Sequence, residues 1–336
     1  MNEFGAVSVH TRSVDDAVAI GAGVYHPHVL RLRDRGEGFG MHLRASPIGP
    51  IVIGALEYRT PVSIRAAEFL DSYQVNLPLY GDVLMSYAGR EHRATTRQAV
   101  VHGPAAPSRV DGWRTPARLL AVKVQSAHLE NALASILGHS IQRPIGFHGA
   151  VDVTSAAGRE WAALARRLDW WARFREEDDP LVGPTLTDAV VRGLLRAGRH
   201  EYTSELDDAL ASDPDAAVHR VLSLMHRRAA SGASIGDIAE EAGVGLRTLE
   251  KRFQSRWAHT PSGMLRDIRL AYARRNLRHP ESAELLVADV AARWGLPHPG
   301  RFAARYAERF GESPSTTLFR AAGARARAAG AIAVGA

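Results

Sequence analysis

The sequence predicts an α+β protein with an antiparallel β domain near its N-terminus and an all-α domain of two helix-turn-helix units near its C-terminus. Three observations support this: short β segments, helical apolar stripes after them, and a duplicated helical motif in the last third of the chain. At 336 residues, the chain is long enough for two cores. We expect four parts, namely residues 1–150, a helical layer at 151–212, the helix-turn-helix domain at 213–320 and a mobile tail at 321–336.

The composition excludes several classes of protein. The chain has no cysteine, so disulfides, thiolate zinc sites and cysteine nucleophiles are all excluded. No apolar run reaches the ~20 residues needed to span a bilayer, and the first residues lack the pattern of a secretory signal. We therefore expect a cytoplasmic protein that makes no contact with a membrane.

The charge is unevenly distributed along the chain. Residues 216–327 carry 19 Lys and Arg against 10 Asp and Glu, whereas residues 1–215 carry 23 against 26. This asymmetry favours an anionic partner for the C-terminal half. A solvated basic surface without any partner fits the charge equally well.

The β segments lie between residues 51 and 124, separated by turns rich in Gly, Pro and Asp. They are IVIGALEY, VSIRAAEF, SYQVNLPLYG, DVLMSYAG, QAVVHGP and ARLLAVKV. This pattern predicts a small antiparallel barrel or sandwich. A few polar residues interrupt the apolar ones, which suits a mostly apolar pocket for a small molecule. The residues that we expect to contact this molecule are Tyr73, Asn76, Tyr80 and Arg97.

The histidines do not predict a metal site. Those of the N-terminal part are scattered, at His26, His28, His42, His92, His102 and His148. The pair His26 and His28 has the spacing of two ligands, but it lies ahead of the β segments and Pro27 separates its members. We therefore expect neither a metal nor another cofactor.

Two helices are predicted between residues 152 and 200. The first begins at Thr154 or Ser155 and carries Trp161, Leu164, Leu168 and Trp171 on one stripe. The second carries Leu186, Val190 and Leu194 at helical spacing. These stripes either cover the β domain or pair two subunits across a two-fold interface.

Residues 234–262 and 285–315 repeat one pattern. Asp237, Ala239 and Gly243 match Asp289, Ala291 and Gly295 at an offset of 52. Leu249, Phe253, Trp257, Pro261 and Ser262 match Phe302, Tyr306, Phe310, Pro314 and Ser315 at an offset of 53. The two matching glycines suit helix ends that turn sharply, because glycine tolerates positive φ. Each copy therefore predicts a helix-turn-helix, with one extra residue in the second turn.

The second helix of each copy has one face free for a ligand. In the first copy, the side opposite Leu249 and Phe253 presents Arg247, Lys251 and Gln254, with Glu250 beside them. In the second copy, the corresponding residues are His298, Arg301, Ala304 and Arg305. Such residues contact bases or phosphates in DNA, and Ala304 can touch a thymine methyl group. Solvated charge is the alternative interpretation.

Further helices complete and link the two copies. Residues 213–229 predict a helix in front of the first copy, and residues 261–277 predict a connector between the copies. At ~1.5 Å per residue the connector is about 26 Å long. With its flanking turns, it can set two recognition helices about one DNA turn, ~34 Å, apart.

Residues 213–320 resemble the two-part helix-turn-helix domain of the AraC/XylS family of bacterial transcription regulators. The resemblance lies in IAEEAGVGLRTLEKRF, IRLAYARRNL and DVAARWGLPHPGRFAARYAERFGESP. One departure is Gly245, where the family usually has serine or a similar cap; glycine costs only a few tenths of a kcal/mol there. SYQVNLPLYGDVLMSYAG and VYHPHVLRL also resemble the cupin-like ligand-binding domain that precedes the DNA-binding half in many of these regulators.

The resemblance implies a sequence-specific transcription regulator that binds double-stranded promoter DNA and responds to a small-molecule effector. A homodimer and contact with RNA polymerase are further expectations. The basic surface and the likeness to the XylS branch favour an organic acid as the effector. The alternative is a cupin-type metal-dependent enzyme with an accessory helical domain, which requires a metal or an acid/base pair in the β domain.

Overall fold

The structure is a computed structural model. It describes residues 5–33, 38–66, 71–87, 89–104, 108–113, 116–173, 179, 181–212, 216–279 and 285–321. The expected mobile tail lies outside the described residues after Ala321. The chain divides into two compact units, unit 1 with Met1–Arg175 and Pro184–Asp213, and unit 2 with Glu176–Gly183 and Pro214–Ala336. Among the described helices, none is long and apolar enough to cross a membrane.

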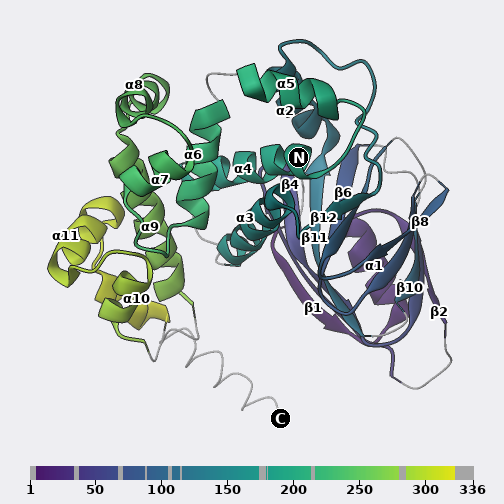
Figure 1. Cartoon of the computed structure of the whole chain (residues 1–336). Coiled ribbons are helices and arrows are strands. Elements are labelled where there is room, and N and C mark those ends of the chain that lie inside the picture. Colours follow the sequence, from purple (N-terminus) through teal and green to yellow (C-terminus); the bar gives the residue numbers. More distant parts are fainter. Residues whose placement is uncertain are drawn as a thin grey trace. The chain divides into compact units, whose positions relative to one another are not determined.

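Unit 1 contains two antiparallel sheets with flanking helices (Figure 1). Its strands are β1 (Val7–Thr11), β2 (His28–Leu32), β3 (Met41–Ile48), β4 (Ile51–Tyr58), β5 (Val62–Ala66), β6 (Ser72–Tyr80), β7 (Val83–Tyr87), β8 (Arg90–Ala94), β9 (Gln98–His102), β10 (Ser108–Trp113), β11 (Ala117–Gln125) and β12 (Ala150–Asp152). Its helices are α1 (Val14–Val24), α2 (Ser126–Leu137), α3 (Ala156–Ala172), α4 (Val182–Ala197) and α5 (Thr203–Ser212), and the first residues of α4, up to Gly183, fall in unit 2.

The described strands form two open sheets and do not close into one barrel. The larger sheet has the order β1-β3-β4-β11-β6-β9-β12, and the smaller has the order β2-β5-β10-β7-β8. The six β segments predicted from the sequence are β4, β5, β6, β7, β9 and β11. In the larger sheet, β6 and β11 are central and are buried almost throughout, because both faces of these strands are covered.

The core of unit 1 draws residues from both sheets and from α1. Met41 and Tyr58 come from the larger sheet, Met85 and Trp113 from the smaller one, and Ala17 from α1. The rings of Tyr58 and Trp113 meet edge to face, with centroids 4.9 Å apart and planes at 83°. This packing joins the two sheets, as in a β-sandwich.

The helix α3 covers the larger sheet. It packs against β3 and β4, and its stripe of Trp161, Leu164 and Leu168 is fully buried. Asp169 of α3 accepts a hydrogen bond from Arg44 of β3, with 2.5 Å between the side-chain atoms. The predicted apolar stripe of α3 is therefore used within one chain, and a dimer that involved α3 would use its polar face.

Unit 2 is helical. Its helices are α6 (Ala216–Arg227), α7 (Ile235–Glu241), α8 (Leu246–Trp257), α9 (Pro261–Leu277), α10 (Val287–Arg293) and α11 (Pro299–Phe310), followed by a helical segment at 314–321. Ser234 and Asp237 form the predicted capping box at the start of α7. Gly243 and Gly295 have φ of 70° and 65°, as the sharp turns after α7 and α10 require. The pairs α7–α8 and α10–α11 are the two predicted helix-turn-helix units.

The helix α9 is the centre of unit 2. It packs against α6, α7, α8 and α10, and its residues Met264, Ile268 and Tyr272 are fully buried. The Tyr272 hydroxyl donates to or accepts from Nδ1 of His226 on α6, 2.8 Å away. The predicted connector is thus also the helix around which both helix-turn-helix units are built.

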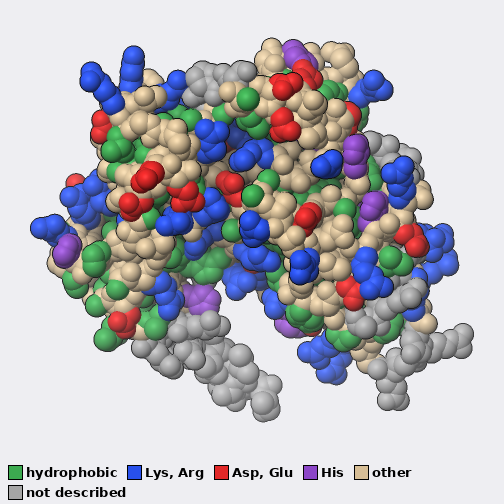
Figure 2. Space-filling model, in the orientation of Figure 1, with side chains coloured by type: hydrophobic (Ala, Val, Ile, Leu, Met, Phe, Trp, Pro, Cys, Tyr) green, Lys and Arg blue, Asp and Glu red, His purple; other side chains and the backbone are tan. Residues whose placement is uncertain are grey.

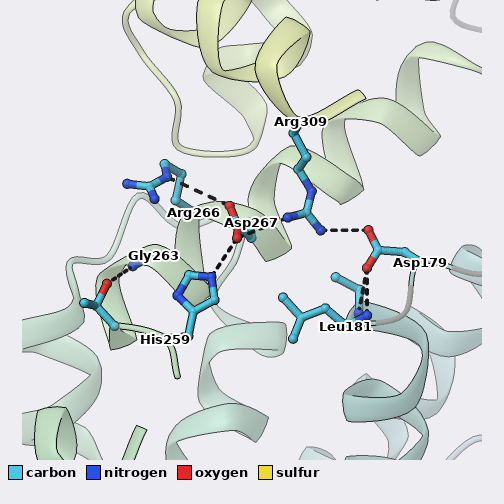
Figure 3. Close-up of polar contacts among 9 residues, drawn as sticks. Asp179, Leu181, His259, Gly263, Arg266, Asp267 and Arg309 are labelled. Atoms are coloured by element: carbon cyan, nitrogen blue, oxygen red, sulfur yellow. Dashed lines mark hydrogen bonds and ion pairs between the residues drawn. The ribbon is translucent and has the colours of Figure 1, made fainter. Parts of the chain in front are cut away.

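A polar cluster in unit 2 joins the end of α8 to α9 and α11 (Figure 3). The Asp267 carboxylate on α9 accepts from Nε2 of His259 at 2.9 Å and pairs with Arg309 of α11 at 3.1 Å. Arg309 also donates to Asp179 at 2.8 Å, and Asp179 accepts from backbone N–H groups at the start of α4. The cluster therefore fixes α11 against α9 through charge-assisted hydrogen bonds.

Candidate DNA-binding surface and effector cavity

The first candidate recognition helix is α8, which begins after the N-cap residue Gly245. Leu249 and Phe253 are fully buried on one of its sides. The residues predicted to contact DNA, Arg247, Glu250, Lys251 and Gln254, are all exposed. Within the described part of the chain, the side chains of Arg247 and Lys251 have no hydrogen-bond or ion-pair partner. This face of α8 is therefore available to a ligand.

The second candidate recognition helix, α11, has the same arrangement. Phe302 and Tyr306 are buried, and the Tyr306 hydroxyl donates to Thr317 at 2.8 Å, which anchors α11 to the helical segment at 314–321. The predicted contact residues His298, Arg301, Ala304 and Arg305 are exposed. A Cβ on Gly300 would meet nothing within 4 Å, so the start of the exposed face has no side chain and leaves room for close approach.

Two acidic side chains of unit 2 pair with arginines away from these two faces. Glu241 pairs with Arg228 at 3.0 Å, and Glu312 pairs with Arg320 at 2.6 Å. Figure 2 shows Lys and Arg side chains protruding from the surface over α8 and α11. Among the described residues of unit 2, uncompensated positive charge therefore lies on the two recognition helices, where a polyanion would contact it.

Unit 1 contains a cavity of about 80 Å³ between the two sheets. Its wall is largely apolar and aromatic, with Leu43 and Tyr58 from the larger sheet and Met85 and Trp113 from the smaller one. The polar lining residues are Tyr25, His26, His28, Gln74, Asn76 and His102. An apolar wall with a few convergent polar groups is typical of a small-molecule site.

Of the four residues predicted to contact the small molecule, Asn76 lines this cavity and the other three do not. The Tyr73 hydroxyl donates to Glu130 of α2 at 2.9 Å and accepts from the N–H of Ile145 at 2.7 Å. It therefore links β6 to α2 and to the segment at Ile145. Tyr80 is 43% exposed at the end of β6, and Arg97 lies exposed in the turn between β8 and β9. The sequence-based interpretation did not include Gln74, which shares a strand face with Asn76 because side chains alternate along β6.

Two amides of β6 form a polar pair in the cavity wall. Nε2 of Gln74 donates to Oδ1 of Asn76 at 3.2 Å and to the Val75 carbonyl at 3.4 Å. Oε1 of Gln74 is buried and has no partner among the described residues. Nδ2 of Asn76 faces the sulfur of Met85 at 3.8 Å, which is a weak acceptor. The pair therefore presents one unused acceptor and one almost unused donor.

A second polar group lies where α1 meets β2. Nδ1 of His28 lies 2.9 Å from the carbonyl of His26, and since a carbonyl only accepts, Nδ1 carries the proton. In the neutral ring Nε2 is then an acceptor, and it has no partner among the described residues; the same holds for the buried Tyr25 hydroxyl. A Cβ on Gly21 would lie 2.7 Å from the His28 ring, so glycine is required there for this ring to pack on α1.

Burial lowers the pKa of two histidines in the cavity wall, His26 and His102. Burial, with a smaller effect of the charge of His92, lowers the pKa of His102 to about 3, and the ring stacks on Tyr87 with centroids 5.6 Å apart. Burial, with the charge of Lys123, lowers the pKa of His26 to about 3. Although three histidines line one cavity, no group of three or more His, Asp or Glu in the described ranges is arranged to hold a metal ion.

We expect acid to destabilise unit 1 through these histidines. As the pH falls below about 6.5, an unfolded histidine binds a proton, whereas His102 in the fold stays neutral until about pH 3. The folded state therefore loses up to about 1.4 kcal/mol per pH unit for this one group over that window. Urea unfolding at several pH values should show that the stability of His102→Gln falls less steeply between pH 6.5 and 4.5 than that of the wild type. Equal slopes would contradict this assignment.

Comparisons with known proteins agree with this architecture. Residues 17–197 match the family described as AraC-binding-like domain, and residues 238–320 match the family described as helix-turn-helix domain. The chain is 32% identical to the probable thc operon regulatory protein of Rhodococcus erythropolis, over 91% of this chain and 93% of that protein. It is 33% identical to the XylDLEGF operon transcriptional activator 3 of Pseudomonas putida, over 83% of this chain and 82% of that protein. Among solved structures, the AraC-like transcriptional activator CuxR matches 80% of this chain and 96% of its own, with a TM-score of 0.42 and 15% identity. Because one family match covers more than half of the chain and the relatives align along nearly its whole length, the chain belongs to the AraC/XylS family of transcription regulators.

Proposed function

We propose that α8 and α11 each enter a major groove of promoter DNA and that the cavity of unit 1 binds the small-molecule effector. The observation that carries this proposal is the matched exposure of two helices. Each buries an apolar stripe, and each leaves its predicted contact residues in solvent. Helix-turn-helix proteins place the second helix of the motif in the groove in this way.

The residues have different roles in this proposal. Arg247 and Lys251 lie on the free face of α8 and read base edges, with Gln254 and Glu250 beside them. The predicted contact residues of α11 include fewer side chains able to form base-specific hydrogen bonds than those of α8. Arg301 and Arg305 therefore mainly contact phosphates, which position the protein without reading sequence.

The decisive experiment is a selection of genomic DNA fragments by the full-length chain. We expect a small set of fragments to be enriched, with a shared motif, and their affinity to exceed that of bulk DNA at physiological salt by about a thousandfold or more. Equal affinity for all fragments would leave only non-specific binding to a basic surface and would end the proposal. The double variant Arg247→Ala, Lys251→Ala is the control that separates reading by α8 from charge elsewhere.

Arg247→Ala and Arg301→Ala should affect DNA binding in different ways. Loss of a base contact at Arg247 should cost about 1 to 3 kcal/mol on the selected site and relax discrimination at one base pair. Loss of a phosphate contact at Arg301 should weaken all sequences alike and reduce the slope of log affinity against log salt by about one. Titrations of both variants on matched and mismatched sites measure this. An unchanged ratio of matched to mismatched affinity in Arg247→Ala would rule out base reading by Arg247.

The remaining expectations are part of the same proposal. The characterised relatives are regulators, which favours regulation over the alternative of a cupin-type enzyme. A homodimer, contact with RNA polymerase and a cytoplasmic location also remain proposals. Sedimentation of the full-length chain with and without its DNA site would give the number of copies that bind together.

A further inference from the structure

The described lining of the effector cavity contains no permanently charged side chain. Among the described residues that line it there is no Asp, Glu, Lys or Arg. Lys123, whose charge acts on His26, lies outside the lining, and its ammonium donates to the Tyr25 carbonyl at 2.6 Å. An ionised carboxylate in this cavity would lose its hydration without gaining a cation, which is strongly unfavourable.

The unused polar atoms of the cavity require both a donor and an acceptor on the ligand. Oε1 of Gln74 and, in the neutral ring, Nε2 of His28 are acceptors without a partner among the described residues, so each needs an N–H or O–H from the ligand. Nδ2 of Asn76 faces only a thioether within that part of the chain, and the Tyr25 hydroxyl has no partner there, so both can donate. A carboxylate offers acceptors only and would leave the buried Gln74 oxygen unpaired, at a cost of about 1 to 3 kcal/mol.

The size of the cavity limits the rest of the molecule. A single water needs roughly 10 to 15 Å³ of such space, so a cavity of about 80 Å³ has room for roughly five to eight water-sized groups. Tyr58 and Trp113 form part of the wall and favour a flat or compact apolar body. The polar atoms of β6 and of His28 would hold its polar end.

We infer that this cavity takes an uncharged small molecule of the amide class, with a compact apolar body and a single polar end that both donates and accepts hydrogen bonds. The inference rests on the proposed function, since it names the chemical class of the effector. It replaces the organic acid expected from the basic surface, because the positive charge of the chain is not in the lining of the cavity.

Two pairs of compounds of nearly equal shape test the inference on the wild-type, full-length chain. The pairs are benzamide with benzoate and isobutyramide with isobutyrate, measured by calorimetry and thermal shift at neutral pH. We expect each amide to bind at least tenfold more tightly than its acid. Equal or tighter binding of either acid, or no binding of both amides at millimolar concentration, would overturn the inference.

The variant Gln74→Met tests whether the amide ligand contacts Gln74 in the cavity wall, because methionine has a similar volume but lacks the side-chain amide. We expect about a tenfold loss of amide affinity, the usual effect of losing one hydrogen bond of this kind. Gln142→Met is the matched control, since Gln142 is exposed and outside the cavity lining, and its side chain donates one hydrogen bond, to Ser140. Amide binding that is the same in Gln74→Met and Gln142→Met would overturn the assignment to this cavity.

The affinity for promoter DNA distinguishes a failure of the proposed ligand class from a failure of the proposed regulatory role. If the amides bind and depend on Gln74 while DNA affinity stays constant, the ligand class is supported and the regulatory role of the cavity fails. If DNA affinity responds to the acids and not to the amides, the regulatory role is supported and the ligand class fails. A response of about 5-fold to 150-fold is the usual range of such coupling.

Discussion

Phe253→Ala should destabilise unit 2 by about 3 to 5 kcal/mol and abolish binding to the selected DNA site. Phe253 is fully buried in α8 and packs on Trp257, with ring centroids 4.9 Å apart. Removing the ring leaves a cavity beneath the recognition helix, which the surrounding helices fill only in part. Amide hydrogen exchange in α7 and α8 measures the effect as a lower free energy of local opening.

Leu246→Ala is the matched control for Phe253→Ala. Leu246 lies on the same helix and is also a large apolar residue, but it is 46% exposed. We expect its truncation to change the stability of unit 2 by no more than about 0.5 kcal/mol. If the two variants lost equal stability, the stripe of α8 would not be the buried face, and the assignment of Arg247 and Lys251 to the opposite face would fail with it.

Arg269→Met should cost about 2 to 5 kcal/mol, because it leaves two buried carbonyl groups without a donor. Nε of Arg269 donates to the Ala229 carbonyl at 3.0 Å, and its terminal nitrogen donates to the Ala233 carbonyl at 2.6 Å. Burial lowers the pKa of this guanidinium. Its carbon would lie 3.1 Å from a Cβ on Gly295, so it packs between the loop before α7 and the turn of the second helix-turn-helix.

The control for Arg269→Met is Arg266→Met on the same helix. The Arg266 side chain is 37% exposed, and its contact with Asp267 is a distant one at 3.9 Å. A partly exposed ion pair contributes little, so we expect a loss below about 1 kcal/mol. Thermal unfolding of both variants decides the matter, and equal losses would show that Arg269 does not hold the two turns together.

The sequence predicted the helix-turn-helix units well because their signals are local. Gly243 and Gly295 mark the turns, and Leu249 and Phe253 mark the buried face of α8, all within short stretches of chain. The central role of α9 was not predicted. Its buried face includes Arg269, a residue type that periodicity assigns to solvent, and only the carbonyl groups that receive its hydrogen bonds explain its burial.

The effector cavity was harder to predict because its parts are far apart in the sequence. His28 precedes the first predicted β segment, whereas His102 ends β9, and only the packing of the two sheets against each other brings both to one cavity. Alternation along β6 indicated Asn76 and could have indicated Gln74. Tyr80 has the same parity, but a register shift between β6 and β11 and the end of the strand leave it at the surface.

The central claim is that one chain places α8 and α11 in two successive major grooves of DNA. Methylation interference at guanine N7, with the full-length chain on its selected site, tests this claim most directly, because N7 lies in the major groove. We predict two windows of interference about one helical turn apart, with Arg247→Ala removing contacts from one window only. A single window, or the loss of both windows in Arg247→Ala, would contradict the account.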